Sequence, residues 1–181
     1  MKSFKSIIVF LFVSYLSFVF ATGGSVVITC YLYVDEFWEE THVLKNASLQ
    51  QIKESCPGNV QQMKRIIVKG LAKVLYEDSL KGIPPLHKIE IVNVRLEEIQ
   101  PGTFQSLPKF TTIDLRDNNL LEIQSGTFVN LEVETLFLHR NLISVLHDGA
   151  FQNASIVQLN LERNCLQELK PGAFQNVTVW K

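Results

Sequence analysis

The sequence predicts an α/β solenoid: a curved stack of repeats with parallel strands on its concave face and irregular loops on its convex face. Two observations lead to this prediction. A Gly-x-Phe triplet occurs four times, at 102–104, 126–128, 149–151 and 172–174, at intervals of 24, 23 and 23 residues. Aliphatic residues recur at matching distances before each triplet. A fixed period of this length is the signature of a repeat architecture.

Length and composition agree with a folded chain and argue against several classes of protein. The 181 residues are 46% hydrophobic and 19% charged, which is too apolar for a disordered or collagen-like chain. The net charge of -1 gives no overall basic field, so a nucleic-acid partner is not expected. Part of the positive mean hydropathy, +0.13, comes from one block at the start.

This first block, residues 1–21, has the pattern of a secretory signal peptide. Lys2 and Lys5 precede an apolar run over residues 7–20, and Val19 and Ala21 occupy the -3 and -1 positions if cleavage follows Ala21. The run is shorter than the ~20 apolar residues that a membrane span needs. We therefore expect a secreted, extracellular protein with no membrane span in its mature chain. An uncleaved anchor is the alternative interpretation.

Three N-glycosylation sequons agree with secretion. They begin at Asn46, Asn153 and Asn176, and none has Pro at its middle position. Asn153 and Asn176 both lie two residues after a repeat Phe. Their glycans are expected to project from the loop side and to leave the concave strands clear.

The cysteines favour a disulfide over a metal site. Cys30 and Cys56 lie in the same non-repetitive segment, where an oxidising compartment favours their pairing. Cys165 is the odd cysteine. No Cys-x-x-Cys motif accompanies them and the four His residues are dispersed, so no metal ligands are assigned.

Residues 22–64 are expected to form an N-terminal disulfide-linked cap. Val26 to Val34 alternates as a strand with one wholly apolar face. The spacing of Ser48 and Gln51 predicts a short helix over 48–55. A bridge between the two cysteines of this segment closes a loop of about 26 residues and contributes ~3 kcal/mol of stability.

Residues 65–181 are expected to form the repeats, four of them clear and one degenerate. The first inward aliphatic positions of the clear repeats are Ile89, Ile113, Leu136 and Leu159. The degenerate unit is marked by Leu80, Ile83 and Leu86, which precede Ile89 with the spacing by which Phe104, Leu107 and Phe110 precede Ile113.

The pattern resembles that of the extracellular leucine-rich repeat family over about residues 80–179, Leu-x-x-Leu-x-Leu-x-x-Asn-x-Leu-x-x-Leu-x-x-Gly-x-Phe-x-x-Leu. With its signal peptide, two-cysteine cap and sequons, the chain is more particularly similar to secreted arthropod leucine-rich repeat proteins, including those of mosquito complement-like immunity. The resemblance implies a recognition protein of innate immunity. Two features depart from it: Val94 stands where the family has Asn, and the cysteine-rich C-terminal cap of many extracellular members is missing.

The repeat pattern has a direct physical interpretation. Each Leu-x-Leu strand turns two aliphatic side chains inward, and only stacking with neighbouring repeats buries them. Asn118, Asn141 and Asn164 are expected to stack beyond the strands, where their amides bond to buried turn N–H and C=O groups. Strands are spaced ~4.8 Å apart, and we expect the loops that hold the repeat Phe residues to need more room. The stack should therefore curve with its strands inside.

The outward strand positions are the expected ligand-binding surface: Arg116, Phe137, His139, Arg140, Asn160 and Glu162. Mixed charge around an isolated aromatic suits protein recognition. No nucleophile, base and oxyanion donor converge in the sequence, so neither a catalytic site nor a cofactor is assigned. Most of these residues are equally well explained as ordinary solvated strand faces. For Phe137, flanked by Asp114 and Asn160, an anchor role and an ordinary exposed aromatic are equal alternatives.

The last repeat is expected to lack a cap. Trp180 follows Phe174 by six residues, as Phe110 follows Phe104, so the sequence stops where another strand should begin. This leaves two explanations: the chain is a truncated product of a longer gene, or another copy or partner covers the end. In the second case, Cys165 is a candidate for a link between two chains, although a partly buried free thiol is the commoner fate of one odd cysteine.

The favoured function is a secreted recognition module that binds an extracellular protein or a microbial surface. A truncated ectodomain of an adhesion or receptor protein and an extracellular inhibitor are the alternatives. The sequence names no ligand.

Overall fold

The computed structural model describes residues 26–34, 37–47, 63–77, 79–80, 83 and 87–179. The predicted signal peptide at 1–21, the helix predicted at 48–55 and Cys56 lie outside these residues. No helix occurs in the described segments, and accordingly none there is long and apolar enough to cross a membrane.

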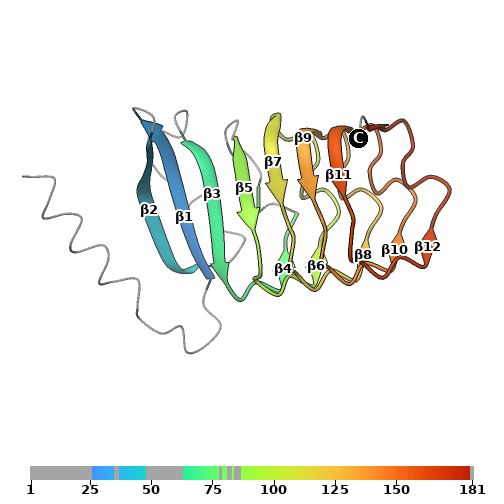
Figure 1. The fold of residues 1–181 in the computed structure, drawn as a ribbon, viewed down its shortest axis with the longest axis horizontal. Helices are drawn as coiled ribbons and strands as arrows, with labels where there is room; N and C mark the ends of the chain where they lie inside the picture. The colour runs from blue at the N-terminus through green and yellow to red at the C-terminus, as the bar shows by residue number, and fades with distance from the viewer. Residues whose placement is uncertain are drawn as a thin grey trace, which may run out of the picture.

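Eight strands form one continuous sheet in the order β13-β11-β9-β7-β5-β3-β1-β2 (Figure 1). From β3 onward, adjacent strands of this sheet run parallel and belong to successive turns of the chain. Their bounds are Met63–Gly70 (β3), Lys88–Ile91 (β5), Phe110–Asp114 (β7), Glu132–Phe137 (β9), Ser155–Asn160 (β11) and Thr178–Val179 (β13).

The N-terminal segment adds a hairpin to this sheet. β1 (Val26–Val34) pairs antiparallel with both β2 (Phe37–Ala47) and β3. The strand predicted at Val26 to Val34 is confirmed, whereas β2 was not predicted. The sheet thus runs without a break from the hairpin into the repeats.

Each turn also carries a second, two-residue strand on the opposite side of the solenoid. β4 (Val74–Leu75) pairs with β6 (Glu98–Ile99), and β8 (Glu122–Ile123), β10 (Val145–Leu146) and β12 (Glu168–Leu169) form a three-stranded ladder. The predicted solenoid of parallel strands is confirmed, but its described repeats consist of strands joined by loops and contain no helix. One reason is that left-handed residues interrupt each loop, such as Gly102 (φ +84) and Ser106 (φ +52).

The core fills the space between the two sets of strands. The aliphatic side chains that the pattern places inward, Ile89, Ile91, Ile113, Leu115, Leu136 and Leu138, have no exposed surface. The Phe rings of neighbouring repeats stack on one another with centroids 5.0 to 5.1 Å apart. This is close to the ~4.8 Å spacing of strands.

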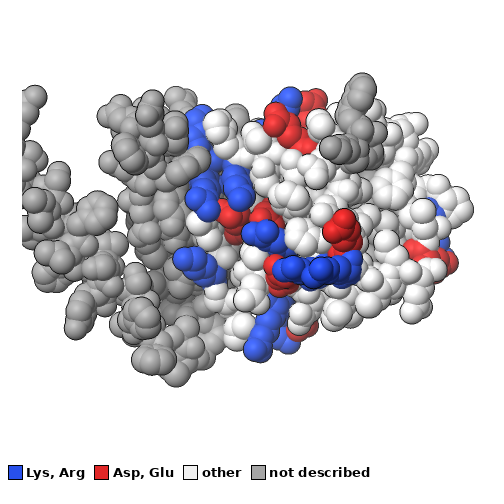
Figure 2. Space-filling view, in the orientation of Figure 1, with Lys and Arg blue, Asp and Glu red and all other residues white. Residues whose placement is uncertain are grey.

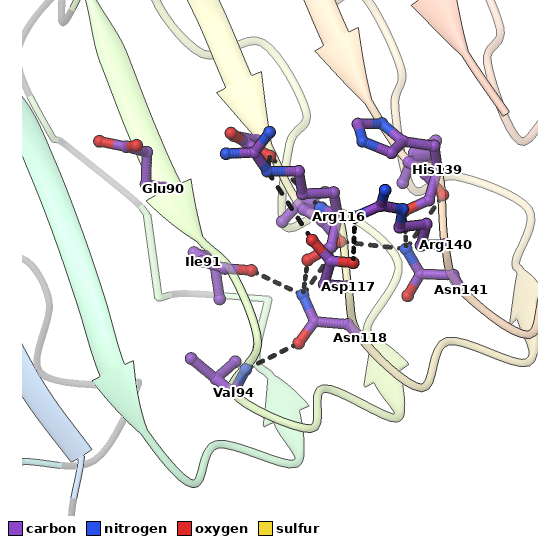
Figure 3. A network of polar contacts seen from close by, with 12 residues as sticks. Glu90, Ile91, Val94, Arg116, Asp117, Asn118, His139, Arg140 and Asn141 are labelled. Atoms are coloured by element: carbon purple, nitrogen blue, oxygen red, sulfur yellow. Dashed lines mark hydrogen bonds and ion pairs between the residues drawn. The ribbon is translucent and has the colours of Figure 1, made fainter. Parts of the chain in front are cut away.

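The predicted Asn ladder is confirmed by its hydrogen bonds. Nδ2 of Asn118 donates to the carbonyls of Ile91 (2.6 Å) and Leu115 (2.9 Å), and its Oδ1 accepts from the N–H groups of Val94 and Leu96 (Figure 3). Asn141 and Asn164 repeat the arrangement one and two turns later. Val94, which replaces the first Asn, is fully buried.

Candidate binding face

The concave face is the outward surface of β3, β5, β7, β9 and β11 and of the residues directly after these strands. Strand register places five side chains in one row across its middle: Ile67, Glu90, Asp114, Phe137 and Asn160. The predicted placement of Phe137 between Asp114 and Asn160 is therefore confirmed. Phe137 is half-buried rather than fully exposed, and the ring of His139 packs against it.

At the N-terminal side of the row, Glu90 is held between two cations. Its carboxylate lies 2.5 Å from Nε of Arg65 and 3.0 Å from Nζ of Lys88. Burial opposes ionisation of Glu90, but the hydrogen bonds and charges of Arg65 and Lys88 outweigh it and hold the pKa below its ordinary value. Glu90 is accordingly a satisfied carboxylate.

Asp114, the next residue in the row, has a different environment. It is only 2% exposed, yet its Oδ1 lies 3.4 Å from the backbone N of Arg116 and 3.5 Å from Nε of the same residue, both long contacts. Burial raises the pKa of Asp114, and the charge of Glu90 adds to this, while the charges of Arg116 and Lys88 offset part of it. The pattern placed Asp114 on the outward face and gave no sign that it is buried.

A band of ionic contacts continues beside Asp114 (Figure 3). Nε of Arg116 lies 3.9 Å from Oδ2 of Asp117, and Nη1 of Arg140 lies 3.4 Å from Oδ1 of Asp117. Asp117 and Arg140 both adopt left-handed backbone conformations, with φ of 56° and 55°. This repeated turn directs both side chains to the same edge of the face.

His139 lies beside Phe137, with the two rings edge to face at a centroid distance of 5.5 Å. Within the part of the chain that the structure describes, Nδ1 of His139 is buried and has no hydrogen-bond partner. Nε of Arg116 is likewise buried with no hydrogen bond there, although it makes the ion pairs described above. The middle of the concave face thus contains polar groups that the fold itself does not fully satisfy.

The remaining predicted ligand-binding residues lie at the C-terminal side. Oδ1 of Asn160 accepts a hydrogen bond from the backbone N of Glu162 (2.9 Å), and the Glu162 side chain is exposed. The structure therefore places Arg116 and Phe137 next to Asp114, His139 next to Phe137, and Arg140 next to Asp117, with Asn160 and Glu162 on the adjoining turn. In Figure 2, basic and acidic side chains are mixed over the central strands rather than gathered into a patch of one sign.

The other predicted positions are the sequons and the cysteines. Asn153 and Asn176 are exposed at the turns two residues after Phe151 and Phe174, and Asn46 lies in β2. Cys165 is exposed and free. The backbone of Cys30 is in β1, and its proposed partner in the disulfide, Cys56, lies outside the described residues.

Among the described residues, no group of three or more His, Cys, Asp or Glu side chains is arranged to hold a metal ion. The titratable residues of the concave face occur mainly in ion pairs along a surface. This arrangement is suited to contact with another macromolecule.

Comparison with known proteins identifies the repeats. A family model for the leucine-rich repeat matches residues 84–143 and 132–178. Searches of curated proteins and of solved structures gave no match. Leucine-rich repeats are typically non-enzymatic modules that bind protein partners. Because the matched residues make up more than half of the chain and the fold has the same stacked turns, this protein belongs to the leucine-rich repeat family.

Proposed function

We propose that this protein is a secreted recognition module of innate immunity, and that its concave face binds an extracellular protein or a microbial-surface ligand. The observation that carries the proposal is the buried carboxylate of Asp114 at the middle of that face. An ionised carboxylate with only long contacts lowers the stability of the fold. Residues that cost stability are concentrated at functional sites.

The neighbours of Asp114 supply the other parts of a recognition surface. Phe137 offers an aromatic ring that is half-buried and already oriented by His139, so little conformational entropy is lost when a partner packs on it. Arg116 and Arg140 lie on the same face, in ion pairs with Asp114 and Asp117, and their guanidinium groups can pair with polar groups of a partner. The sequons at Asn153 and Asn176 begin at exposed turns outside the face, so glycans there would leave it free for a ligand.

The first experiment tests secretion and identifies a partner. Full-length chain expressed in cells with a secretory pathway should reach the medium without its first 21 residues. The mature protein, immobilised, should then retain a specific component of extracellular fluid or of microbial cell surfaces. Retention of the chain inside the cells with an intact N-terminus would contradict the proposal.

The second experiment tests the face. Phe137→Ala should weaken binding of the retained component by ~2 kcal/mol, about 30-fold in Kd. Because Phe137 is half-buried, thermal unfolding of each variant must be compared. Leu121→Ala is the matched control, since Leu121 is 56% exposed but lies outside the concave face. Equal Kd values for wild type and Phe137→Ala would exclude Phe137 from the site.

We also propose that a second copy of the chain covers the last described turn. There Leu166 is 47% and Leu169 60% exposed, although the equivalent residues one turn earlier, Ile143 and Leu146, are buried. Leu166 and Leu169 border a hollow of about 370 Å³ that Phe174 also lines. Exposed Cys165 adjoins Leu166, so contact through this end brings a thiol of each copy to the interface.

Sedimentation of the mature protein tests this association. A dimer is expected at micromolar concentration, with a fraction that only reductant dissociates. Leu169→Asp should give a monomer by placing a charge in the apolar contact, and Cys165→Ser should remove only the fraction that reductant dissociates. A wild-type monomer with and without reductant would contradict the proposal.

A further inference from the structure

A second ladder of Asn side chains runs along the flank that leads into the long strands. Asn130, Asn153 and Asn176 occupy the same place in three successive turns, with φ of 52°, 55° and 54°. Nδ2 of Asn153 donates to Oδ1 of Asn130 (3.3 Å), and Nδ2 of Asn176 donates to Oδ1 of Asn153 (3.2 Å). All three residues are exposed.

Two members of this flank ladder begin sequons, and Nδ2 is the atom to which an N-linked glycan bonds. Asn153-Ala154-Ser155 and Asn176-Val177-Thr178 are sequons, whereas Asn130 is followed two residues later by Glu132. The glycosidic bond replaces one of the two N–H groups of the amide. The other N–H can still donate along the ladder, so one glycan is compatible with the geometry.

Two glycans on adjacent turns are a different case. Nδ2 of Asn176 lies 3.2 Å from Oδ1 of Asn153, and the rings of Phe151 and Phe174, two residues earlier in each turn, are stacked at 5.0 Å. Both Asn residues have the same left-handed backbone, so their side chains leave the surface in parallel. An N-linked glycan is bulky and branched, and two of them starting from this spacing would occupy the same volume.

We propose that a single molecule carries a glycan on Asn153 or on Asn176, but not on both. This inference rests on the proposed secretion, because only a chain in the secretory pathway is glycosylated. It adds that occupancy of one sequon excludes occupancy of the sequon on the adjacent turn. The molecule then exists as two glycoforms that carry their sugar on neighbouring turns of the same flank.

Site-resolved mass spectrometry of the secreted full-length chain tests this. In wild type, the intact mass should show one glycan for the pair, in addition to any glycan on Asn46. Thr178→Ala removes the second sequon but keeps Asn176 in the flank ladder, and should raise occupancy at Asn153. Ser155→Ala should raise occupancy at Asn176 in the same way; Ser155 and Thr178 are both exposed.

A distance control uses the unglycosylated member of the ladder. Glu132→Thr creates a sequon at Asn130. Combined with Ser155→Ala, it leaves sequons at Asn130 and Asn176, two turns apart, and both should be occupied in one molecule. Combined with Thr178→Ala, it leaves sequons at Asn130 and Asn153 on adjacent turns, and only one should be occupied.

The possible results separate this inference from the proposal on which it rests. Wild-type molecules with glycans on both Asn153 and Asn176 would overturn the inference. Secreted molecules with a glycan on Asn46 but none on the pair would also overturn it and would leave secretion supported. A chain that is neither secreted nor glycosylated would refute the proposed function and the inference together.

Discussion

Replacement of Asn118 by Ala is expected to be among the most destabilising changes in this protein. The side chain is 4% exposed, and five hydrogen bonds join it to the backbone of two turns. Without it, the N–H groups of Val94 and Leu96 lose the acceptor that Oδ1 provides. The carbonyl of Leu115 keeps a donor, since Nδ2 of Asn141 also bonds to it at 3.1 Å.

The magnitude follows from these contacts. A buried polar group left without a partner costs about 1 to 3 kcal/mol, so two such donors cost ~4 kcal/mol. Asn164 is the matched control, because its Oδ1 accepts one hydrogen bond among the described residues, from the N of Ile143, and the residue is half-buried at the last clear turn. Asn164→Ala should therefore cost ~1 to 2 kcal/mol.

Denaturant unfolding followed by far-UV circular dichroism measures both free energies of unfolding. The measurement needs no ligand or partner, so the test is independent of the proposed function. Losses of equal size in Asn118→Ala and Asn164→Ala, or a loss below ~1 kcal/mol for Asn118→Ala, would refute the role given to the buried ladder.

Two further pairs of variants test the electrostatics and the backbone. Burial raises the pKa of Asp114, so the folded state holds the proton more tightly than the unfolded state. The contribution of Asp114 to the free energy of unfolding therefore falls as pH rises from the unfolded-state pKa to the folded-state pKa. Asp114→Asn should be more stable than wild type at pH 7 and lose its advantage near pH 3. The pKa of Glu90 is lowered instead, so its contribution is present at pH 7 and is lost in acid; Glu90→Gln should be less stable than wild type at pH 7, and unfolding curves at both pH values check the two signs. Gly126 has φ +83 and Gly172 has no positive φ, while an added methyl group would meet only ordinary van der Waals contacts at both positions. Gly126→Ala should therefore lower the free energy of unfolding by ~1 kcal/mol more than Gly172→Ala. Equal losses would exclude backbone strain as the cause.

The repeat period made most of the fold predictable. Side chains at fixed places in each turn can be buried only by the same places in the next turn, so a regular spacing of aliphatic residues determines the solenoid. The Asn positions could be assigned for the same reason, because each turn leaves the same backbone groups to satisfy. Strand β1 was predictable from its alternation alone.

Other features could not be predicted because they depend on neighbours rather than on period. β2 contains Glu39, Glu40 and Lys45 and lacks a clean apolar alternation, so its pairing with β1 left little trace in the sequence. The burial of Asp114 depends on residues of adjacent turns, more than 20 positions away along the chain.

The repeat period constrains the choice of residue least on the concave face, so the presence of Asp114 there is informative about function. Its position faces outward in every turn and accepts Glu, Phe and Asn in neighbouring turns, so stacking does not require a carboxylate there. If the carboxylate has no part in recognition, Asp114→Asn should improve stability and leave binding of the retained component unchanged. If it serves recognition, the same substitution should raise the free energy of unfolding at pH 7 and weaken binding by ~1 kcal/mol or more, about fivefold in Kd. Opposite changes in the two measurements are the result we expect, and unchanged Kd in a stabilised variant would show that the buried carboxylate is not part of the binding site.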